Sequence, residues 1–270
     1  MSSSFAVLGS PIDHSLSPVM HAAIIAQLGV DADYGRFEVS TDDLPGFLSQ
    51  HEHFEGFSLT MPLKSAVRRL VVSECDVSLL TGAVNTIVRG PEGWDGFNTD
   101  VWGAQQAIRQ QVSDIGSSGV ILGAGATAQS VLVALVGLGV DDVTVLVRDT
   151  SRVQALMEVA ARLGITPVVA TLGVSVEADI AVNTVPGSGQ LSPEAIDAID
   201  TAVLFDVVYD PWPTPLASEW SARDLPVING KSLLVWQALR QARIFYGGDA
   251  DEELPSEHHI LTSMRSAVGL

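Results

Sequence analysis

The chain has little positive charge and no long apolar run. Only 14 of its 270 residues are lysine or arginine, against 32 aspartates and glutamates, and the formal charge is −18. This balance argues against unaided binding to nucleic-acid phosphates or anionic lipid, so we expect neither a nucleic-acid nor a membrane partner. The longest apolar stretch near the middle, Val131 to Val140, contains two glycines and is about half the length of the roughly 20 residues that span a bilayer.

Cysteine is scarce and metal-ligand spacing is missing. The single Cys75 cannot form an internal disulfide, and the segment MSSSFAVLG lacks the positive region and apolar stretch of a signal peptide. We therefore expect a cytoplasmic protein in which Cys75 is a structural thiol. The pairs His51, His53 and His258, His259 have no third ligand at metal spacing, so we interpret them as surface residues and predict no metal site.

Apolar residues are plentiful at 47%, which is ample for a core, and the length suits two domains of about 150 residues each. Short runs of Val, Ile and Leu alternate with segments of helical period, a pattern typical of parallel βαβ units. The predicted fold class is α/β. The expected strands cover residues 5–8, 34–39, 56–59, 83–88, 119–122, 143–147, 166–170, 180–184 and 203–207. The expected helices cover residues 18–28, 42–49, 62–72, 100–111, 127–138, 151–163 and 231–246, with a last helix from about 256.

A glycine-rich turn follows the strand Val120–Leu122 and leads into a helix. It has the pattern G-x-G-x-x-A, in which Gly123 permits a tight turn and Gly125 lets a pyrophosphate approach the backbone at the helix N-terminus. The alternative is that both glycines serve only the strand-to-helix turn. The full turn consists of Gly123, Ala124, Gly125, Ala126, Thr127 and Ala128.

The end of the next strand indicates the type of dinucleotide. An NAD enzyme places an acid there for the ribose 2′-hydroxyl, whereas this strand ends at Val147 and is followed by Arg148 and Arg152. A guanidinium can stack on adenine and bind a 2′-phosphate, so the sequence favours NADP. Asp149 would repel that phosphate if it pointed inward, so we expect it to face solvent. The alternative for both arginines is a solvated helix start.

Polar residues also gather where strands of the N-terminal half end, which suggests a substrate cleft. Ser15 and Ser17 are two residues apart and can face the same ligand oxygens, although Ser17 before Pro18 is also a good helix N-cap. The alternative for Asp100 is a helix N-cap, and the alternative for Lys64 is a surface charge. The remaining clusters are residues 58–64, 82–86 and 96–100.

Together these motifs resemble the shikimate dehydrogenase family, in order and spacing along the full chain. The matching segments are Gly9-Ser10-Pro11-Ile12-Asp13-His14-Ser15-Leu16-Ser17-Pro18, Thr60-Met61-Pro62-Leu63-Lys64, Gly82-Ala83-Val84-Asn85-Thr86, Asn98-Thr99-Asp100, Tyr209 and Gln237. The resemblance implies a substrate-binding catalytic domain of residues 1–100 and 231–270, an N-terminal α/β domain completed by C-terminal helices. It also implies a Rossmann-type NADP-binding domain of residues 101–230.

The same resemblance implies an activity and a set of site residues. The activity is the reversible NADPH-dependent reduction of 3-dehydroshikimate to shikimate in aromatic amino-acid (chorismate) biosynthesis, by a monomer or homodimer. Lys64 and Asp100 are implied as the catalytic pair. The implied substrate-binding residues are Ser15, Ser17, Thr60, Lys64, Asn85, Asp100, Tyr209 and Gln237. The expected cofactor-binding residues are Gly123, Ala124, Gly125, Ala126, Thr127, Ala128, Arg148, Asp149, Arg152, Val207 and Gly230.

Two segments depart from the family pattern. Ser58 replaces an asparagine that opens the family's N-V-T-x-P-x-K segment, and Val147-Arg148-Asp149 replaces its N-R-T cofactor motif. Two other functions stay open: an NAD-dependent dehydrogenase of quinate or of both acids, and a non-catalytic NADP-binding regulator. The missing acid at Val147 argues against the first. Because a mere binder has no use for a proton donor, Lys64 with Asp100 argues against the second.

Overall fold

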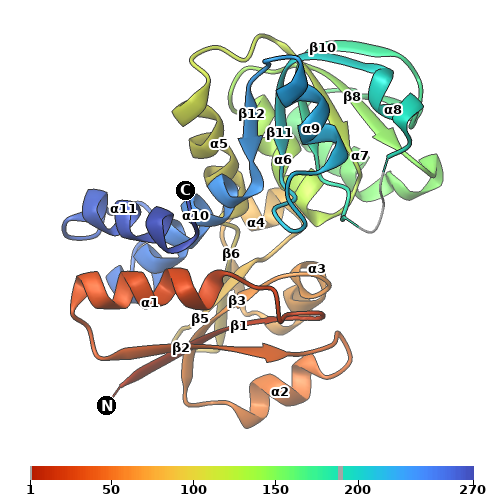
Figure 1. Cartoon of the computed structure of the whole chain (residues 1–270). Helices are drawn as coiled ribbons and strands as arrows, with labels where there is room; N and C mark the ends of the chain where they lie inside the picture. The colour runs from red at the N-terminus through yellow and green to blue at the C-terminus, as the bar shows by residue number, and fades with distance from the viewer. Residues whose placement is uncertain (1, 188–190) are drawn as a thin grey trace. The chain divides into compact units, whose positions relative to one another are not determined.

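The computed structural model describes residues 2–187 and 191–270 and divides the chain into two compact units (Figure 1). Unit 1 consists of residues 1–99 and 234–270, and unit 2 of residues 100–233. Each unit is built on its own six-stranded sheet. Within the described ranges, no helix combines the length and the apolar character needed to cross a membrane.

The sheet of unit 1 is mixed. Its strand order is β2-β1-β3-β5-β6-β4, with β1 parallel to β2 and β3, and β5 antiparallel to both of its neighbours. The strands are β1 Ser3–Gly9, β2 Ala32–Glu38, β3 Phe54–Leu59, β4 Ser73–Glu74, β5 Thr86–Arg89 and β6 Trp94–Phe97.

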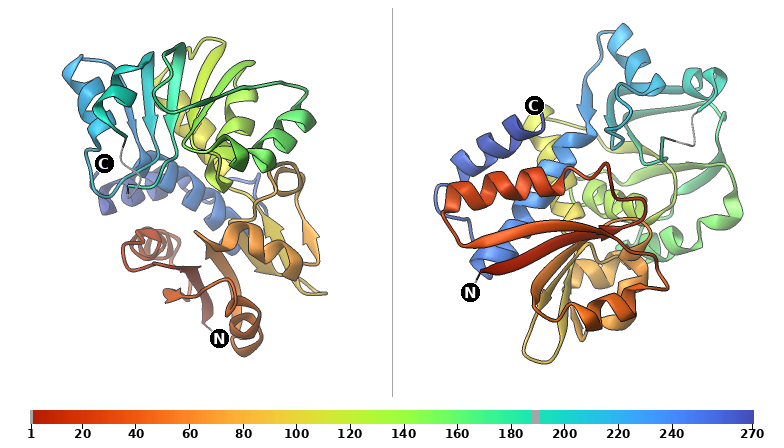
Figure 2. Two further views of the ribbon diagram at one scale, coloured as in Figure 1. Left: turned by 90° about the vertical axis from the view of Figure 1, so that its right-hand side faces the viewer. Right: turned by 60° about the horizontal axis from the view of Figure 1, so that its bottom comes forward.

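Helices cover both faces of this sheet, and α1 and α11 lie side by side on one of them (Figures 1 and 2). Along β1, Ala6 and Leu8 join one apolar cluster while Phe5 packs with Ile244 and Phe245 in another, because successive strand residues face opposite sides. The helical segments are α1 Ser17–Leu28, α2 Leu44–Gln50, α3 Leu63–Ala66, the 3₁₀ turn η1 Val67–Leu70, α4 Asp76–Thr81, α10 Gly230–Ala242, the π-helical segment η3 Arg243–Gly247 and α11 Glu257–Ala267. The chain passes from unit 2 to unit 1 within α10.

The sheet of unit 2 is entirely parallel, with the strand order β12-β11-β10-β7-β8-β9 (Figure 2). This is the doubly wound order, in which the winding direction reverses between β7 and β10 and ligands bind beyond the carboxyl ends of the strands at that point. The strands are β7 Ser118–Leu122, β8 Asp142–Val147, β9 Val168–Thr171, β10 Val176–Asn183, β11 Ile199–Asp206 and β12 Val227–Asn229. The helices are α5 Asp100–Gln111, α6 Ala126–Val136, η2 Thr150–Arg152, α7 Gln154–Leu163, α8 Pro193–Asp197 and α9 Pro215–Ala222.

The α/β class is confirmed, and several expected boundaries are wrong. The helix expected over 62–72 is divided into α3 and η1, and the strand expected from 83 begins at Thr86 because the Val84 N–H donates to the carbonyl of Lys64 in α3. Several short elements were missed. One of these is β6, whose aspartate and glycine disfavour a strand but whose Trp94 packs under the guanidinium of Arg89. The other missed elements are β4, α4, α8, α9 and β12.

Candidate active site

Backbone hydrogen bonds in unit 1 bring the segment of Lys64 next to that of Asn85. Lys64 is half-buried in α3, and its carbonyl accepts from the Val84 N–H at 2.8 Å. The next residue, Asn85, makes two backbone hydrogen bonds. Its carbonyl accepts from Leu59 N at 2.7 Å, and its N–H donates to Phe97 O at 2.9 Å. Three chain segments that the sequence assigned to one cleft therefore meet at Asn85.

Ser15, Ser17 and Thr60 follow the carboxyl ends of β1 and β3. The Ser17 N–H donates to Ser15 Oγ at 3.3 Å, which draws the two serines together. Helix α1 begins at Ser17 with Leu16 as its N-cap, so the N-cap interpretation of Ser17 is wrong. Thr60 lies against Gly9 so closely that a Cβ at Gly9 would overlap the Thr60 methyl group. Glycine at this position thus lets the ends of β1 and β3 approach.

The amide of Asn85 is held in one orientation. Its Oδ1 accepts from the backbone N–H of Thr99 at 2.9 Å and from the Thr86 hydroxyl at 2.9 Å, while its Nδ2 donates to Thr99 Oγ1 at 2.9 Å. A backbone N–H can only donate, so the amide oxygen must face Thr99 N. Asn85 is 1% exposed and Thr86 0%, and both are therefore committed to this network.

Two glutamines of α10 continue the network. Gln237 and Gln241 are four residues apart and share one helix face. Gln237 Nε2 donates to the Leu234 carbonyl at 2.9 Å, which leaves its Oε1 toward Thr99 Oγ1 at 3.5 Å. Gln241 Nε2 donates to the Asn85 carbonyl at 3.2 Å. The sequence predicted Gln237 for the site and missed Gln241, although its position one turn later on the same face was a usable signal.

Ser58 and Tyr34 form the other end of the network. Tyr34 Oη donates to Ser58 Oγ at 2.6 Å, and Ser58 Oγ donates to Gln241 Oε1 at 2.9 Å. Burial raises the pKa of Tyr34, so its hydroxyl keeps its proton and remains a donor. The tyrosine ring stacks on His21, with ring centroids 3.9 Å apart. Burial lowers the pKa of His21 to about 3, and this imidazole is therefore neutral at pH 7.

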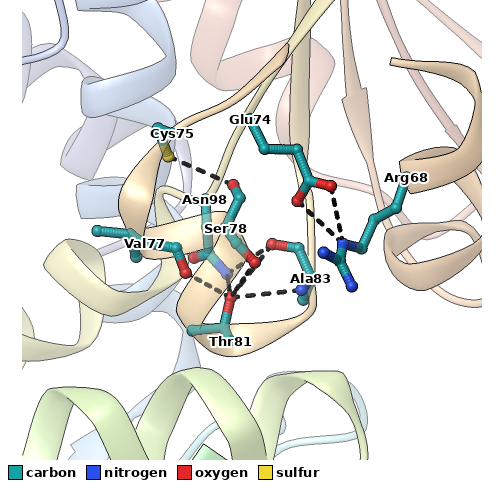
Figure 3. Close-up of polar contacts among 8 residues, drawn as sticks. All are labelled: Arg68, Glu74, Cys75, Val77, Ser78, Thr81, Ala83 and Asn98. Atoms are coloured by element: carbon teal, nitrogen blue, oxygen red, sulfur yellow. Dashed lines mark hydrogen bonds and ion pairs between the residues drawn. The ribbon is translucent and has the colours of Figure 1, made fainter. Parts of the chain in front are cut away.

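A second polar cluster supports the loop before Asn85 (Figure 3). Asn98 Nδ2 donates to Thr81 Oγ1 and to the Ala83 carbonyl, both at 3.0 Å, and Asn98 directly precedes Thr99. The ion pair of Arg68 Nε with Glu74, 2.9 Å long, joins the turn after Lys64's helix to β4. These contacts hold the chain segments next to the loop before Asn85.

Cys75 belongs to the same region as a structural residue. It is the N-cap of α4, and its Sγ lies 3.3 Å from Ser78 Oγ (Figure 3). His51 stacks on the ring of Phe47 and hydrogen-bonds its carbonyl. Within the ranges that the structure describes, no group of three His, Cys, Asp or Glu residues is arranged to hold a metal ion.

In unit 2, the two glycines of the predicted turn have different roles. Gly123 has φ +104°, and a Cβ there would lie 2.5 Å from Thr184 Oγ1, so the fold itself requires this glycine. Gly125 is the N-cap of α6 with φ −78°, and nothing lies within 4 Å of a Cβ built on it. The turn-only alternative explains Gly123 and leaves Gly125 unexplained. The open space fits a ligand that approaches the backbone at the N-terminus of α6, as a dinucleotide pyrophosphate does.

The residues predicted to choose between NADP and NAD lie at the carboxyl end of β8. Val147 is buried, whereas Arg148, Asp149 and Arg152 are exposed. Asp149 Oδ1 accepts from the N–H of Ser151 at 3.0 Å and from its hydroxyl at 2.6 Å, and these bonds lower the pKa of Asp149. The carboxylate therefore caps the turn η2 that carries Arg152.

Val207 and Gly230 also lie together in unit 2. A Cβ on Gly230 would overlap the carbonyl of Val207, so the close approach requires glycine. The Val207 N–H donates to the Asn183 carbonyl at 3.0 Å. Tyr209 is half-buried two residues later, and burial raises its pKa.

Sequence reasoning missed a buried carboxylate beside these residues. Asp206 accepts from Asn183 Nδ2 at 3.0 Å and from Thr214 Oγ1 at 2.6 Å, and burial raises its pKa. Asn183 and Thr214 also line a pocket of about 300 Å³ at the carboxyl ends of β10 and β11. Asn183 and Asp206 each end an apolar strand, which was the available signal.

Some predicted groupings join residues of different units. Asp100 is the first residue of α5 in unit 2 and is 4% exposed, whereas Lys64 lies in unit 1. Tyr209 belongs to unit 2, whereas Ser15 belongs to unit 1. The pairing of Lys64 with Asp100 and the grouping of Tyr209 with the serines stay predictions.

A doubly wound parallel sheet with an open glycine turn, together with a separate unit that gathers polar side chains, defines a class. The chain is an α/β protein of the dinucleotide-binding class.

Comparison with known proteins narrows this class to one family. A family model described as the shikimate dehydrogenase substrate binding domain matches residues 7–87. A shikimate dehydrogenase (NADP(+)) of Crocosphaera subtropica is 32% identical over 257 residues, 88% of this chain and 89% of the relative. The chain belongs to the shikimate dehydrogenase family.

Solved structures agree over nearly the whole chain. The crystal structure of Mycobacterium tuberculosis shikimate dehydrogenase matches with a TM-score of 0.83 and 34% identity, covering 99% of this chain and 98% of that one. The Thermus thermophilus enzyme in complex with NADP(H) and shikimate matches with a TM-score of 0.82 and 30% identity, covering 98% and 99%.

Proposed function

We propose that this chain catalyses the reversible, NADPH-dependent reduction of 3-dehydroshikimate to shikimate, a step of aromatic amino-acid biosynthesis. The observation that carries the proposal is the junction at Asn85, where a half-buried Lys64 segment meets an amide of fixed orientation in a member of this family. The Thermus thermophilus relative, 30% identical, is known in complex with NADP(H) and shikimate.

Lys64 is the proposed general acid. As hydride reaches the ring ketone, negative charge grows on the ketone oxygen, and an ammonium both stabilises that charge and supplies the proton. Asp100 is proposed to position this ammonium, favour its charged form and accept a bond from a substrate hydroxyl. Asn85 and Gln237 are proposed to bind the ring hydroxyls.

The substrate carboxylate is proposed to bind at Ser15, Ser17 and Thr60, with Tyr209. Short hydrogen bonds from hydroxyls replace its water shell in this arrangement. They are needed all the more in a chain with a formal charge of −18, which offers an anion no general attraction.

NADP is the proposed cofactor, and its reduced nicotinamide supplies the hydride. The space at Gly125 and the amides that begin α6, Ala126 to Ala128, are proposed to hold the pyrophosphate. Arg148 and Arg152 are proposed to bind the adenosine 2′-phosphate, and Val207 and Gly230 to contact the cofactor.

The domain roles, assembly and location belong to the same proposal. Residues 1–100 and 231–270 form the substrate-binding domain, and residues 101–230 form the NADP-binding domain. The protein is proposed to work as a monomer or homodimer in the cytoplasm.

The test is an absorbance assay at 340 nm with the purified chain. We expect shikimate to reduce NADP, and 3-dehydroshikimate to oxidise NADPH. Parallel reactions with NAD and with quinate separate the alternatives. No turnover of shikimate with either cofactor would contradict the function, and a higher kcat/KM with NAD and quinate would assign the chain to the other dehydrogenase.

A further inference from the structure

A continuous chain of buried side-chain hydrogen bonds links Tyr34 to Asn85 within unit 1. Tyr34 donates to Ser58, Ser58 to Gln241, Gln241 Nε2 to Thr86 Oγ1 at 3.0 Å, and Thr86 to Asn85 Oδ1. Ser58, Gln241, Thr86 and Asn85 are all at most 3% exposed. Water therefore does not compete for these bonds, and each one constrains the next. We call these five residues the relay.

Two backbone groups fix the direction of the relay. The Asn85 carbonyl can only accept, so the Gln241 atom bonded to it is Nε2, and Gln241 Oε1 faces Ser58. The Ser58 proton is then committed to Gln241, and its lone pair accepts from Tyr34.

At the other end, the Thr99 N–H can only donate, so the Asn85 atom facing it is Oδ1. Thr86 accepts from Gln241 Nε2, and its own proton is therefore directed to Asn85 Oδ1. Both lone pairs of the Asn85 oxygen are occupied. A ligand oxygen that contacts this amide must consequently contact its N–H group.

We propose that Thr86 and Gln241 are positioning residues that act through Asn85, holding its amide so that an N–H of Nδ2 donates to one of the two non-reacting ring hydroxyls of shikimate. This inference rests on the proposed function. Neither residue contacts substrate in this arrangement; the Thr99 N–H sets which atom of the Asn85 amide is the oxygen, and the Thr86 hydroxyl, held by Gln241, fixes that oxygen in place.

Ser58 is a member of the relay. Ser58 Oγ donates to Gln241 Oε1 and accepts from Tyr34 Oη, so it joins these two side chains. Because the Ser58 proton and the Tyr34 proton are both used inside the relay, neither hydroxyl donates to a ligand. Their contribution to recognition is the orientation of Gln241.

The test uses the full chain with Thr86→Val, which removes the hydroxyl at nearly constant volume, and Thr86→Ser, which keeps it. We expect Thr86→Val to raise the KM for shikimate about five- to tenfold, the effect of one buried hydrogen bond, with kcat and the KM for NADP within about twofold of wild type. Thr86→Ser should restore the wild-type KM. Gln241→Leu should reproduce the Thr86→Val result.

Deoxy analogues of shikimate distinguish a positioning role of Thr86 from a general disturbance of the fold. The two analogues that each lack one non-reacting hydroxyl are assayed with wild type and Thr86→Val. For the analogue that lacks the hydroxyl bound by Asn85, both proteins should have the same KM. Thr201→Val, which removes a buried hydroxyl bonded to Val203 O in unit 2, is the control and should change neither KM.

Each outcome has one meaning. If Thr86→Val raises the KM for shikimate and for both analogues by the same factor, or leaves all three unchanged, the inference is overturned while the proposed function stands. If the wild-type protein neither binds nor oxidises shikimate, the proposed function fails and the inference fails with it. Equal KM values for one analogue only would support the inference.

Discussion

The two units present their polar groups in opposite ways. Around Asn85, unit 1 buries side-chain amides and hydroxyls that are hydrogen-bonded to one another. Unit 2 offers an open backbone turn at Gly125 and the exposed guanidinium groups of Arg148 and Arg152. We therefore predict that recognition in unit 1 depends on the orientation of donors, and that recognition in unit 2 depends on space and charge.

The difference determines what a substitution does. Removing one partner from a buried network leaves another polar group unpaired, which costs about 1 to 3 kcal/mol and affects the ligand through geometry. Filling an open turn or deleting an exposed cation costs the folded chain little and acts on the ligand directly. The predictions below test this contrast, beginning with the largest effect.

Among the variants considered, Lys64→Ala should lower kcat most. The ammonium acts chiefly on charge that appears in the transition state, so we expect kcat to fall by about 10² to 10⁴, with shikimate binding largely kept. The measurement is steady-state kinetics at 340 nm with a separate titration of shikimate binding. An unchanged kcat would remove Lys64 from the chemistry.

Arg148→Ala should act on unit 2 mainly through the lost charge. The proposed contact with the 2′-phosphate matters only when that phosphate is present, so the KM for NADP should rise about ten- to a hundredfold, far more than the KM for NAD. Kinetics with both cofactors check this. Equal weakening of both would show that the arginine does not read the phosphate.

Gly125→Ala tests whether NADP binding needs the open space beside the backbone at Gly125. We expect a KM for NADP raised about tenfold with an unchanged melting temperature, because a Cβ at 125 meets no protein atom within 4 Å. The matched variant is Gly123→Ala, which should lower the melting temperature, since that position has φ +104° and a Thr184 contact at 2.5 Å. Thermal unfolding and kinetics of both variants give the comparison. The same loss of stability in both would contradict the division of roles.

The smallest predicted effect concerns His21 and stability. Its pKa is lowered to about 3 by burial against Tyr34 and Tyr246, so the unfolded chain takes up a proton near pH 6.5 while the folded chain does not. Stability from this group is complete above pH 6.5 and is lost as the pH falls, by about 1.4 kcal/mol between pH 7.5 and 5.5. Urea unfolding of His21→Phe should show a correspondingly weaker pH dependence over that interval, and an identical dependence in both proteins would refute the assignment.

The sequence predicted elements whose evidence is local. The strand, glycine turn and helix around Gly125 follow one another in the chain, and they are present as β7 and α6. It did not predict β4, β6 or α4, because such short segments have no periodicity and are held by partners far along the chain, such as the Asn98 contacts to Thr81.

The same limit applies to the candidate site. Asn85 and Gln237 were predicted because their motifs are recognisable. Thr86 was included in the cluster 82–86 without a role, whereas Gln241 and Tyr34 were missed. Their importance lies in which atom donates to which, and only the positions of the Asn85 carbonyl and the Thr99 N–H determine that. Sequence spacing alone contains no such information.

The most direct test of the contrast between the units is calorimetric titration of wild type, Thr86→Val and Gly125→Ala with shikimate and, separately, with NADP. We predict a crossed pattern: Thr86→Val weakens shikimate about five- to tenfold and leaves NADP unchanged, whereas Gly125→Ala weakens NADP about tenfold and leaves shikimate unchanged. If either variant loses affinity for both ligands equally, or for the other unit's ligand, the assignment of side-chain recognition to unit 1 and backbone recognition to unit 2 is contradicted.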